Sequence, residues 1–194
     1  MAIDEALLEL AELPTLRLYG WAPHAVSLGW FQKLADFGDV PADTPIVRRL
    51  TGGGAIHHGD ELTFALAIAA ERLPADLPAS YALVHDAAIA ALAAVGVIAE
   101  RLREGHSPSA RPSTKWCFAE PGEGDLGTPR GKLLGSAQRR IRVPAPRILH
   151  HGSLVLRRPS LTPFVAAVDD AAATDAALRD RLADEFVARL AVSL

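Results

Sequence analysis

One long helical segment stands between two groups of strand-like segments in this chain, and that order restricts the fold. Between residues 80 and 97, apolar side chains recur at the spacing of an α-helix, and Gly96 lies near the expected end. Strand-like alternation occurs on both sides of this segment, over residues 15–19, 25–30, 46–49, 61–69, 131–142 and 147–156. Because these strands do not alternate regularly with helices, we predict an α+β fold, with a mostly antiparallel or mixed sheet and flanking helices.

The other segments extend this prediction. Residues 15–70 and 114–157 are expected to form one sheet, with the 80–97 helix covering one face. The alanines of residues 61–69 also permit a helix there. Residues 103–113 are polar and contain prolines, so a loop is expected. Two further helices are expected, over residues 174–192 and over residues 1–10, the latter with an apolar face of Ile3, Leu7, Leu8 and Leu10.

Length and charge bound the function. A chain of 194 residues can build one substantial core, so we expect one domain over residues 1–194, with residues 158–194 as a helical C-terminal segment. A net charge of −3 and a pI of about 6.1 imply no general affinity for nucleic acid or for an anionic membrane. The apolar stretches 62–70 and 87–97 are too short to span a bilayer, and no secretory signal is evident. We therefore expect a cytoplasmic protein.

Cysteine and lysine are scarce. Cys117 is the only cysteine, which excludes an internal disulfide and a multi-cysteine metal site. Lys33, Lys115 and Lys132 are the only lysines, and the remaining basic residues are arginines. A lysine can lose its proton where an arginine cannot, so each lysine is a candidate for proton transfer.

A glycine-rich turn follows the strand expected at residues 46–49. Gly52, Gly53 and Gly54 permit positive φ angles and a close approach of the backbone to a ligand. Their N–H groups, beside an arginine, could bind a phosphate or carboxylate. The spacing matches neither the P-loop nor the dinucleotide-binding fingerprint, and a simple turn is the alternative.

Two further motifs follow this turn in the same order as in a known family. They are Gly131-Lys-Leu-Leu-Gly-Ser-Ala-Gln-Arg-Arg140 and His150-His-Gly-Ser-Leu-Val-Leu156. With the turn, they resemble the signature segments of the lipoate–protein ligase A and octanoyltransferase family, and the resemblance covers about residues 1–157. It implies the α+β catalytic-domain fold shared by biotin and lipoate protein ligases.

The resemblance also implies a set of site residues. Arg49 and the three glycines would line an acyl or acyl-adenylate site, and Lys132 would be a catalytic lysine. The other residues placed in the substrate-binding site by the motifs are His58, Gly135, Ser136, Ala137, His151 and Gly152.

The family contains two chemistries. Trp116-Cys-Phe-Ala-Glu-Pro121 resembles the segment that bears the nucleophile in one octanoyltransferase branch, so Cys117 would form an acyl thioester. A nearby ammonium lowers the pKa of a thiol, and thioester exchange needs no bound cofactor. The donor would be an acyl carrier protein or a lipoylated protein, and the acceptor a lysine of a lipoyl-domain protein. The alternatives are an ATP- and Mg²⁺-dependent lipoate ligase and a non-catalytic acyl-binding homologue; a lone cysteine is also commonly just a small buried side chain.

Two clusters carry other hypotheses. Histidines are paired at 57/58 and 150/151, but neighbours on a strand point to opposite faces, so each pair offers one ligand to a common site. That falls short of a zinc site unless His85, His106 or a carboxylate joins, and no metal site is predicted. Arg139, Arg140, Arg142 and Arg147 form either a solvated face or a docking strip for an acidic carrier protein.

Overall fold

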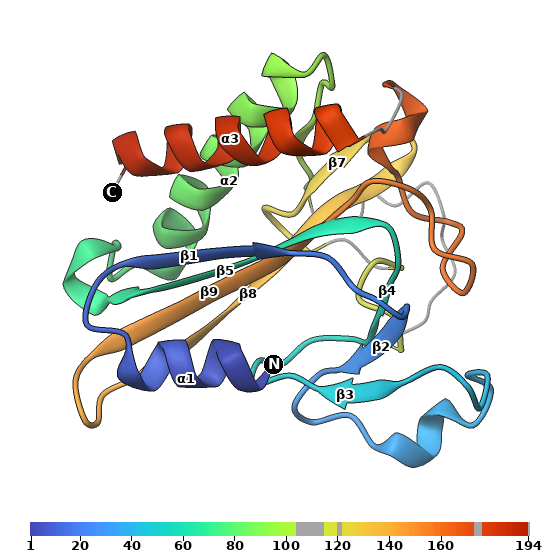
Figure 1. Cartoon of the computed structure of the whole chain (residues 1–194), viewed down its shortest axis with the longest axis horizontal. Coiled ribbons are helices and arrows are strands. Elements are labelled where there is room, and N and C mark those ends of the chain that lie inside the picture. Colours follow the sequence, from blue (N-terminus) through green and yellow to red (C-terminus); the bar gives the residue numbers. More distant parts are fainter. Residues whose placement is uncertain (104–114, 120–121, 173–175, 194) are drawn as a thin grey trace.

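A computed structural model describes residues 1–103, 115–119, 122–172 and 176–193 of the chain (Figure 1). Apart from Arg103, the loop expected over residues 103–113 lies outside these described residues. The main sheet has six strands in the order β1-β5-β9-β8-β7-β6, all paired antiparallel. The strands are β1 (Thr15–Tyr19), β5 (Glu61–Ala69), β9 (Arg147–Val155), β8 (Gly131–Ile141), β7 (Leu126–Thr128) and β6 (Glu100–Arg101).

A separate three-stranded sheet lies beside the main one (Figure 1). It consists of β3 (Ile46–Arg48), β2 (Ala25–Leu28) and β4 (Ile56–His58), with β2 parallel to β3 and antiparallel to β4. The prediction of one sheet over residues 15–70 and 114–157 is therefore wrong. Alternation reports which side chains share a face, but it does not report which strand is the partner.

Strand β5 explains why the main sheet has a helical layer on each side. Its residues are buried almost throughout, and the alternate positions serve different layers. Phe64 and Ile68 belong to the core beneath α2 (Leu77–Ala94) and α3 (Ala176–Ser193), whereas Ala65 and Ala67 pack with Leu8 of α1 (Ala2–Leu10). Residues 61–69 therefore form a strand and not a helix. The small alanines on one face of this strand leave room for α1 to pack closely.

Helix α2 confirms the predicted 80–97 helix, but both ends lie three residues earlier, at Leu77 and Ala94. Asp76 caps it by accepting a hydrogen bond from the backbone N–H of Ala79 at 2.9 Å. Its length and composition alone would also let it cross a membrane, contrary to the expectation that no apolar stretch is long enough. One such helix is weak support for a membrane span, because the core helix of a soluble protein passes the same test. Val84, Ala88 and Leu92 are buried in the core.

Helix α1 differs from its predicted apolar face. Ile3 and Leu10 are exposed, whereas Asp4 is buried beside Leu8. The Asp4 carboxylate accepts hydrogen bonds from Arg17 at 2.7 Å and from the Tyr19 hydroxyl at 3.0 Å, so β1 supplies the partners of this buried charge. Short 3-10 helices occur at η1 (Leu34–Phe37), η2 (Ala70–Arg72) and η3 (Val168–Asp170).

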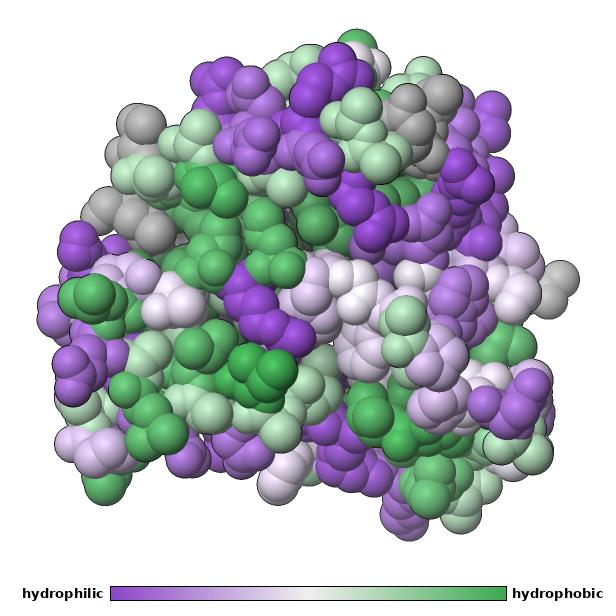
Figure 2. Space-filling view, in the orientation of Figure 1, coloured by the Kyte–Doolittle hydropathy of each residue, from purple (hydrophilic) through white to green (hydrophobic). Residues whose placement is uncertain are grey.

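Exposed hydrophobic side chains gather on the connection between β2 and β3. Figure 2 shows hydrophobic surface over the lower right of the molecule, where this connection lies. Trp30, Phe31 and Leu34 are its large exposed apolar residues.

Candidate active site

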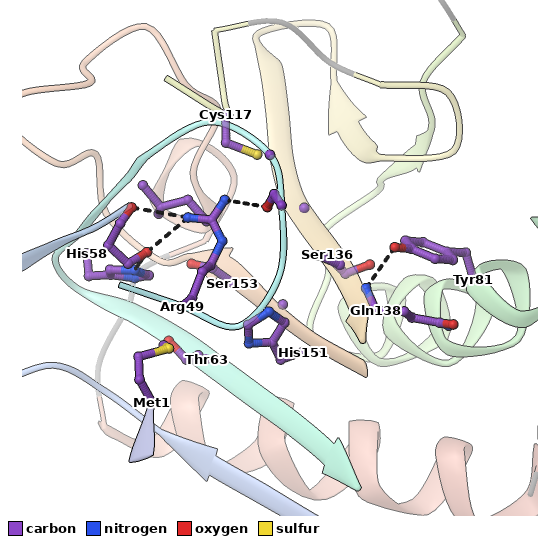
Figure 3. A pocket seen from close by; sticks show the side chains of 17 residues that line it. Met1, Arg49, His58, Thr63, Tyr81, Cys117, Ser136, Gln138, His151 and Ser153 are labelled. Atoms are coloured by element: carbon purple, nitrogen blue, oxygen red, sulfur yellow. Dashed lines mark hydrogen bonds between the residues drawn. The ribbon is translucent and has the colours of Figure 1, made fainter. Parts of the chain in front are cut away.

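A cavity of about 320 Å³ lies between the small sheet and the main sheet. It reaches the α1 side of the main sheet through Thr63 and His151, and Tyr81 of α2 lies at its far side (Figure 3). Ten residues that the sequence placed in the site line this cavity: Arg49, Gly52, Gly53, His58, Cys117, Gly135, Ser136, Ala137, His151 and Gly152.

Two predicted site residues, Gly54 and Lys132, are not among the lining residues. Gly54 packs against the backbone of the cysteine segment: a Cβ there would lie 2.6 Å from Cys117 N. Ala55 bonds to the cysteine segment through both of its backbone groups: its N–H donates to Lys115 O at 2.7 Å, and its carbonyl accepts from Cys117 N–H at 2.8 Å. The absence of a side chain at Gly54 therefore lets the Cys117 segment dock on the turn.

Arg49 stabilises the glycine turn from within. Its guanidinium is buried and donates to the carbonyls of Gly52 at 2.9 Å and Gly54 at 2.5 Å, and to the carbonyl of Ser27 at 3.1 Å. Burial lowers the pKa of Arg49, and negative charge on the Cys117 sulfur opposes that shift. No carboxylate among the described residues forms an ion pair with Arg49, which lines the cavity together with Cys117.

Lys132 reaches Cys117 from inside the protein. Its Nζ lies 3.5 Å from Cys117 Sγ and 3.3 Å from Cys117 O, and 2.6 Å from Oδ2 of Asp125. Burial by itself would lower the pKa of Lys132, but negative charge on Cys117 and Asp125 outweighs this and raises the pKa. The arrangement therefore favours an ammonium beside a sulfur that can carry negative charge.

His58 is held in a buried polar cluster on the cavity wall. Its Nδ1 lies 2.8 Å from Glu61 Oε1 and its Nε2 lies 2.7 Å from Ser27 Oγ. Trp21 stacks on the imidazole at 4.0 Å between ring centres and donates its indole N–H to Thr63. Thr63 in turn donates to Glu61. The cluster fixes the ring of His58 against the cavity.

A second histidine cluster supports β8 from behind. His85 Nδ1 lies 2.7 Å from the carbonyl of Gly124, and because a carbonyl only accepts, this nitrogen carries the proton. Burial lowers the pKa of His85 and of His150, so both are neutral near pH 7. His85 Nε2 then accepts from the Ser136 hydroxyl at 2.7 Å, and Ser136 accepts from His150 Nε2–H at 2.8 Å. Gln138 completes this directed chain by donating to His150 Nδ1 at 3.0 Å.

Within each histidine pair, the two side chains point to opposite faces of the strand, as predicted. His58 and His151 line the cavity, whereas His57 accepts a hydrogen bond from the backbone N–H of Leu161 at 3.2 Å, and His150 belongs to the chain behind β8. His151 Nε2 lies 2.7 Å from Thr51 Oγ1, and burial lowers the His151 pKa to about 4. Within the residues that the structure describes, which exclude His106, no three His, Cys, Asp or Glu side chains are grouped to hold a metal.

The arginine cluster is smaller than predicted. Arg139, Arg140 and Arg142 are exposed at the end of the β8–β9 hairpin, but Arg147 is buried and donates to the carbonyl of Leu8 at 2.8 Å. Arg147 begins β9 on the side that α1 covers, so it belongs to neither a solvated face nor a docking strip.

Other residues of the site were not predicted. Ser27, Thr63, Tyr81, Gln138 and Ser153 line the cavity, and Asp125 pairs with Lys132. Glu61 could have been found from the sequence, because it lies only three residues after His58, at the start of β5. Asp125 had none, since its partner is chosen by the pairing of β7 with β8.

Comparisons with known proteins show the family of this chain. The family model described as the lipoyl protein ligase A/B catalytic domain matches residues 1–190, which extends beyond the segment whose motifs carried the resemblance. The chain is 37% identical over 170 residues to octanoyltransferase LipM of an Exiguobacterium species, covering 80% of this chain and 60% of that protein. It is 36% identical over 169 residues to octanoyltransferase LipM of Kyrpidia tusciae, covering 80% and 61%. The chain thus spans about 60% of the length of these relatives.

Solved structures share the fold. A lipoate-protein ligase A bound with ATP superposes with a TM-score of 0.71 at 24% identity, covering 98% of this chain and 79% of that one. A structure from a structural analysis of an archaeal lipoylation system, which comprises a bipartite lipoate protein ligase and its E2 lipoyl domain from Thermoplasma acidophilum, gives a TM-score of 0.67 at 22% identity, covering 98% of this chain and 77% of that one. These likenesses confirm the predicted α+β fold with an antiparallel main sheet and flanking helices.

Proposed function

The chain belongs to the lipoyl protein ligase A/B catalytic-domain family, and on that premise we propose that it is an acyltransferase working through Cys117. It transfers an octanoyl or lipoyl group to a lysine of a lipoyl-domain protein, with a thioester on Cys117 as the intermediate. The observation that carries the proposal is the contact between the only cysteine and a buried lysine, with Sγ facing the cavity and Nζ 3.5 Å behind it.

The first half-reaction uses the lysine as an acid. The Cys117 thiolate attacks the carbonyl carbon of a donor thioester, a new C–S bond forms, and the bond to the donor sulfur breaks. The departing thiolate takes a proton from the Lys132 ammonium and leaves as a thiol. One thioester replaces another, so no ATP is consumed.

The second half-reaction uses the same lysine as a base. The acceptor amine attacks the thioester carbon of the acyl-enzyme, and the neutral Lys132 amine takes the proton from the attacking nitrogen. The C–S bond breaks, an amide is released, and the thiolate–ammonium pair is restored. An arginine could not serve here, because guanidinium stays protonated.

The glycine turn and the cavity suit this chemistry. Gly52 and Gly53 line the cavity, and their N–H groups donate no hydrogen bond within the described residues, so they are available to the oxyanion of the tetrahedral intermediates. A volume of about 320 Å³ is near the lower end of the roughly 300–1,000 Å³ usual for small-molecule sites, as a single medium-length acyl chain requires.

Partners and compartment follow from the same proposal. The LipM relatives are octanoyltransferases by name, and one structural neighbour comes from a lipoylation system that comprises a lipoate protein ligase and its E2 lipoyl domain. We infer an acyl carrier protein or a lipoylated protein as donor and a lipoyl-domain protein as acceptor, which places the chain in the cytoplasm. No bound cofactor is required.

An ATP-dependent lipoate ligase is the second candidate. It is favoured by the buried Arg49 beside the glycine turn, whose charge no described carboxylate neutralises and which could face the phosphate of an acyl-adenylate. A ligase would consume ATP with Mg²⁺ and release pyrophosphate. A non-catalytic acyl-binding protein, the third reading, would have no use for the Cys117–Lys132 contact.

Mass spectrometry after incubation with an octanoyl-carrier donor tests the proposal. Wild type is expected to gain one octanoyl group on Cys117 and to pass it to a lipoyl-domain acceptor. Cys117→Ser is expected to lose the adduct and at least about 100-fold of the transfer rate, because an alkoxide is harder to form than a thiolate. Lys132→Arg is expected to fail as well, while Lys115→Arg, a lysine two positions from the cysteine, serves as the matched control.

The same variants separate the candidates. Full activity of Cys117→Ser with ATP and free lipoate, accompanied by pyrophosphate release, would overturn the transferase and establish the ligase. Absence of both activities in the wild type would leave the acyl-binding protein.

A further inference from the structure

The Lys132 ammonium has a carboxylate partner that no sequence motif marks. Asp125 Oδ2 lies 2.6 Å from Nζ, and the two side chains are 13% and 3% exposed. Within the described residues Asp125 is the acid that pairs with this lysine. An ammonium removed from water in this way is stable only with such a partner, because an unpaired buried charge costs several kcal/mol.

The backbone around Asp125 is fixed from several sides. Gly122 N–H donates to Oδ2 at 2.7 Å, and Leu102 N–H donates to the carbonyl of Asp125 at 2.7 Å. The directed histidine chain behind β8 ends on the carbonyl of Gly124, one residue away. The carboxylate is therefore positioned by the sheet and by α2 rather than by the lysine it contacts.

The absence of a side chain at Gly135 leaves space for Lys132 and Asp125 to meet. A Cβ at Gly135 would lie 2.5 Å from Lys132 Cε, 2.8 Å from Nζ and 3.6 Å from Asp125 Oδ1. The amine is thus confined between the β8 backbone, the carboxylate and the sulfur, and Phe118 covers it at 4.9 Å from ring centre to Nζ.

We propose that Asp125 is a positioning residue of the transferase, holding the Lys132 amine at the Cys117 sulfur through both half-reactions. This inference rests on the proposed function. Before acylation, the Lys132 ammonium contacts both the Cys117 thiolate and the Asp125 carboxylate. After the sulfur is acylated and the proton has left with the donor thiol, the carboxylate still accepts an N–H from the neutral amine. It then favours return of a proton to the amine from the acceptor nitrogen, since the ammonium that forms is already paired.

Asp125→Asn tests the inference, with Glu123→Gln as the matched control. Asparagine keeps an oxygen for the Gly122 N–H and removes only the charge, and the control removes one charge from an exposed position of the same turn. The first readout is the pH midpoint of Cys117 alkylation by iodoacetamide. Without the Asp125 carboxylate beside them, Cys117 and Lys132 together lose their first proton more easily. The pH midpoint of alkylation is therefore expected to fall by about 1 unit or more.

The second readout is single-turnover kinetics. Release of the octanoyl group from the acyl-enzyme to the acceptor amine is expected to slow at least about tenfold in Asp125→Asn, because a weaker base assists it. Asp125→Glu restores the charge and is expected to return the alkylation midpoint to the wild-type value. If Asp125→Asn does not fold, single-turnover kinetics of Asp125→Glu decide: the added methylene displaces the carboxylate from Nζ, so wild-type aminolysis in this variant contradicts the positioning role.

The two proposals fail separately. A wild-type midpoint and wild-type aminolysis in Asp125→Asn, with Cys117→Ser inactive, would overturn the role of Asp125 and leave the transferase intact. Transfer retained in Cys117→Ser would overturn the transferase, whatever the alkylation midpoints show. Equal changes in Asp125→Asn and Glu123→Gln would mean a general effect of charge, and would also overturn the positioning role.

Discussion

Replacing Gly54 with alanine tests whether the cysteine must sit where the glycine turn holds it. The added Cβ would lie 2.6 Å from Cys117 N and 3.0 Å from both Cys117 Cα and Trp116 C, all of them backbone atoms. Moving from 2.6 Å to 3.4 Å, where ordinary contact begins, displaces the segment by about 0.8 Å. No flexible side chain can absorb this shift.

A displacement of this size acts on the reacting atoms. Misplacement by about 1 Å typically costs on the order of 100-fold in rate, which corresponds to about 2.7 kcal/mol in activation free energy. Overpacking usually lowers stability by about 1–3 kcal/mol, so the variant should remain folded in a protein of ordinary stability. We expect kcat/KM for octanoyl transfer to fall about 100-fold, with the acyl-enzyme forming slowly in mass spectrometry.

The control for this variant is Gly38→Ala. A Cβ at Gly38 meets no atom within 4 Å, and its φ of −67° is open to alanine. Rates are measured well below the unfolding midpoint of each variant, so that loss of folded protein does not enter. Wild-type kcat/KM in a folded Gly54→Ala would refute the reasoning, because the close docking of the turn on Cys117 would then be irrelevant to catalysis.

Two further predictions concern the hairpin arginines and the buried histidine. Glutamate at Arg139, Arg140 and Arg142 together is expected to slow association with an acidic carrier protein at low salt, with the effect shrinking as salt rises; unchanged transfer kinetics at low salt would remove the docking role. His151 has a folded-state pKa of about 4 against an ordinary value of 6.5, so the unfolded chain binds its proton first as the pH falls. The free energy of unfolding is therefore undiminished by His151 above pH 6.5, and it falls by up to about 3 kcal/mol as the pH decreases from 6.5 to about 4. Urea unfolding from pH 7 to pH 4.5 measures this loss, and His151→Asn is expected to have the flatter profile; equal slopes would contradict the assignment.

Local patterns in the chain determined a large part of this protein. The helical spacing between residues 80 and 97, and the alternation in β8 and β9, predicted elements that the structure confirms. These patterns are set by neighbours within one turn or one strand, so no distant contact is needed to read them. The motif resemblance likewise named ten residues that the fold brings to one cavity.

Distant contacts decided the rest. The pairing of β2 with β3 and β4, the burial of Arg147 beneath α1 and the exposed Ile3 all depend on which surfaces meet after the chain has folded. Alternation tells which side chains share a face of a strand, but it is silent about the strand or helix opposite. A charged residue has no periodic signal at all, so the contact of Asp125 with Lys132 became visible only once β7 was paired with β8.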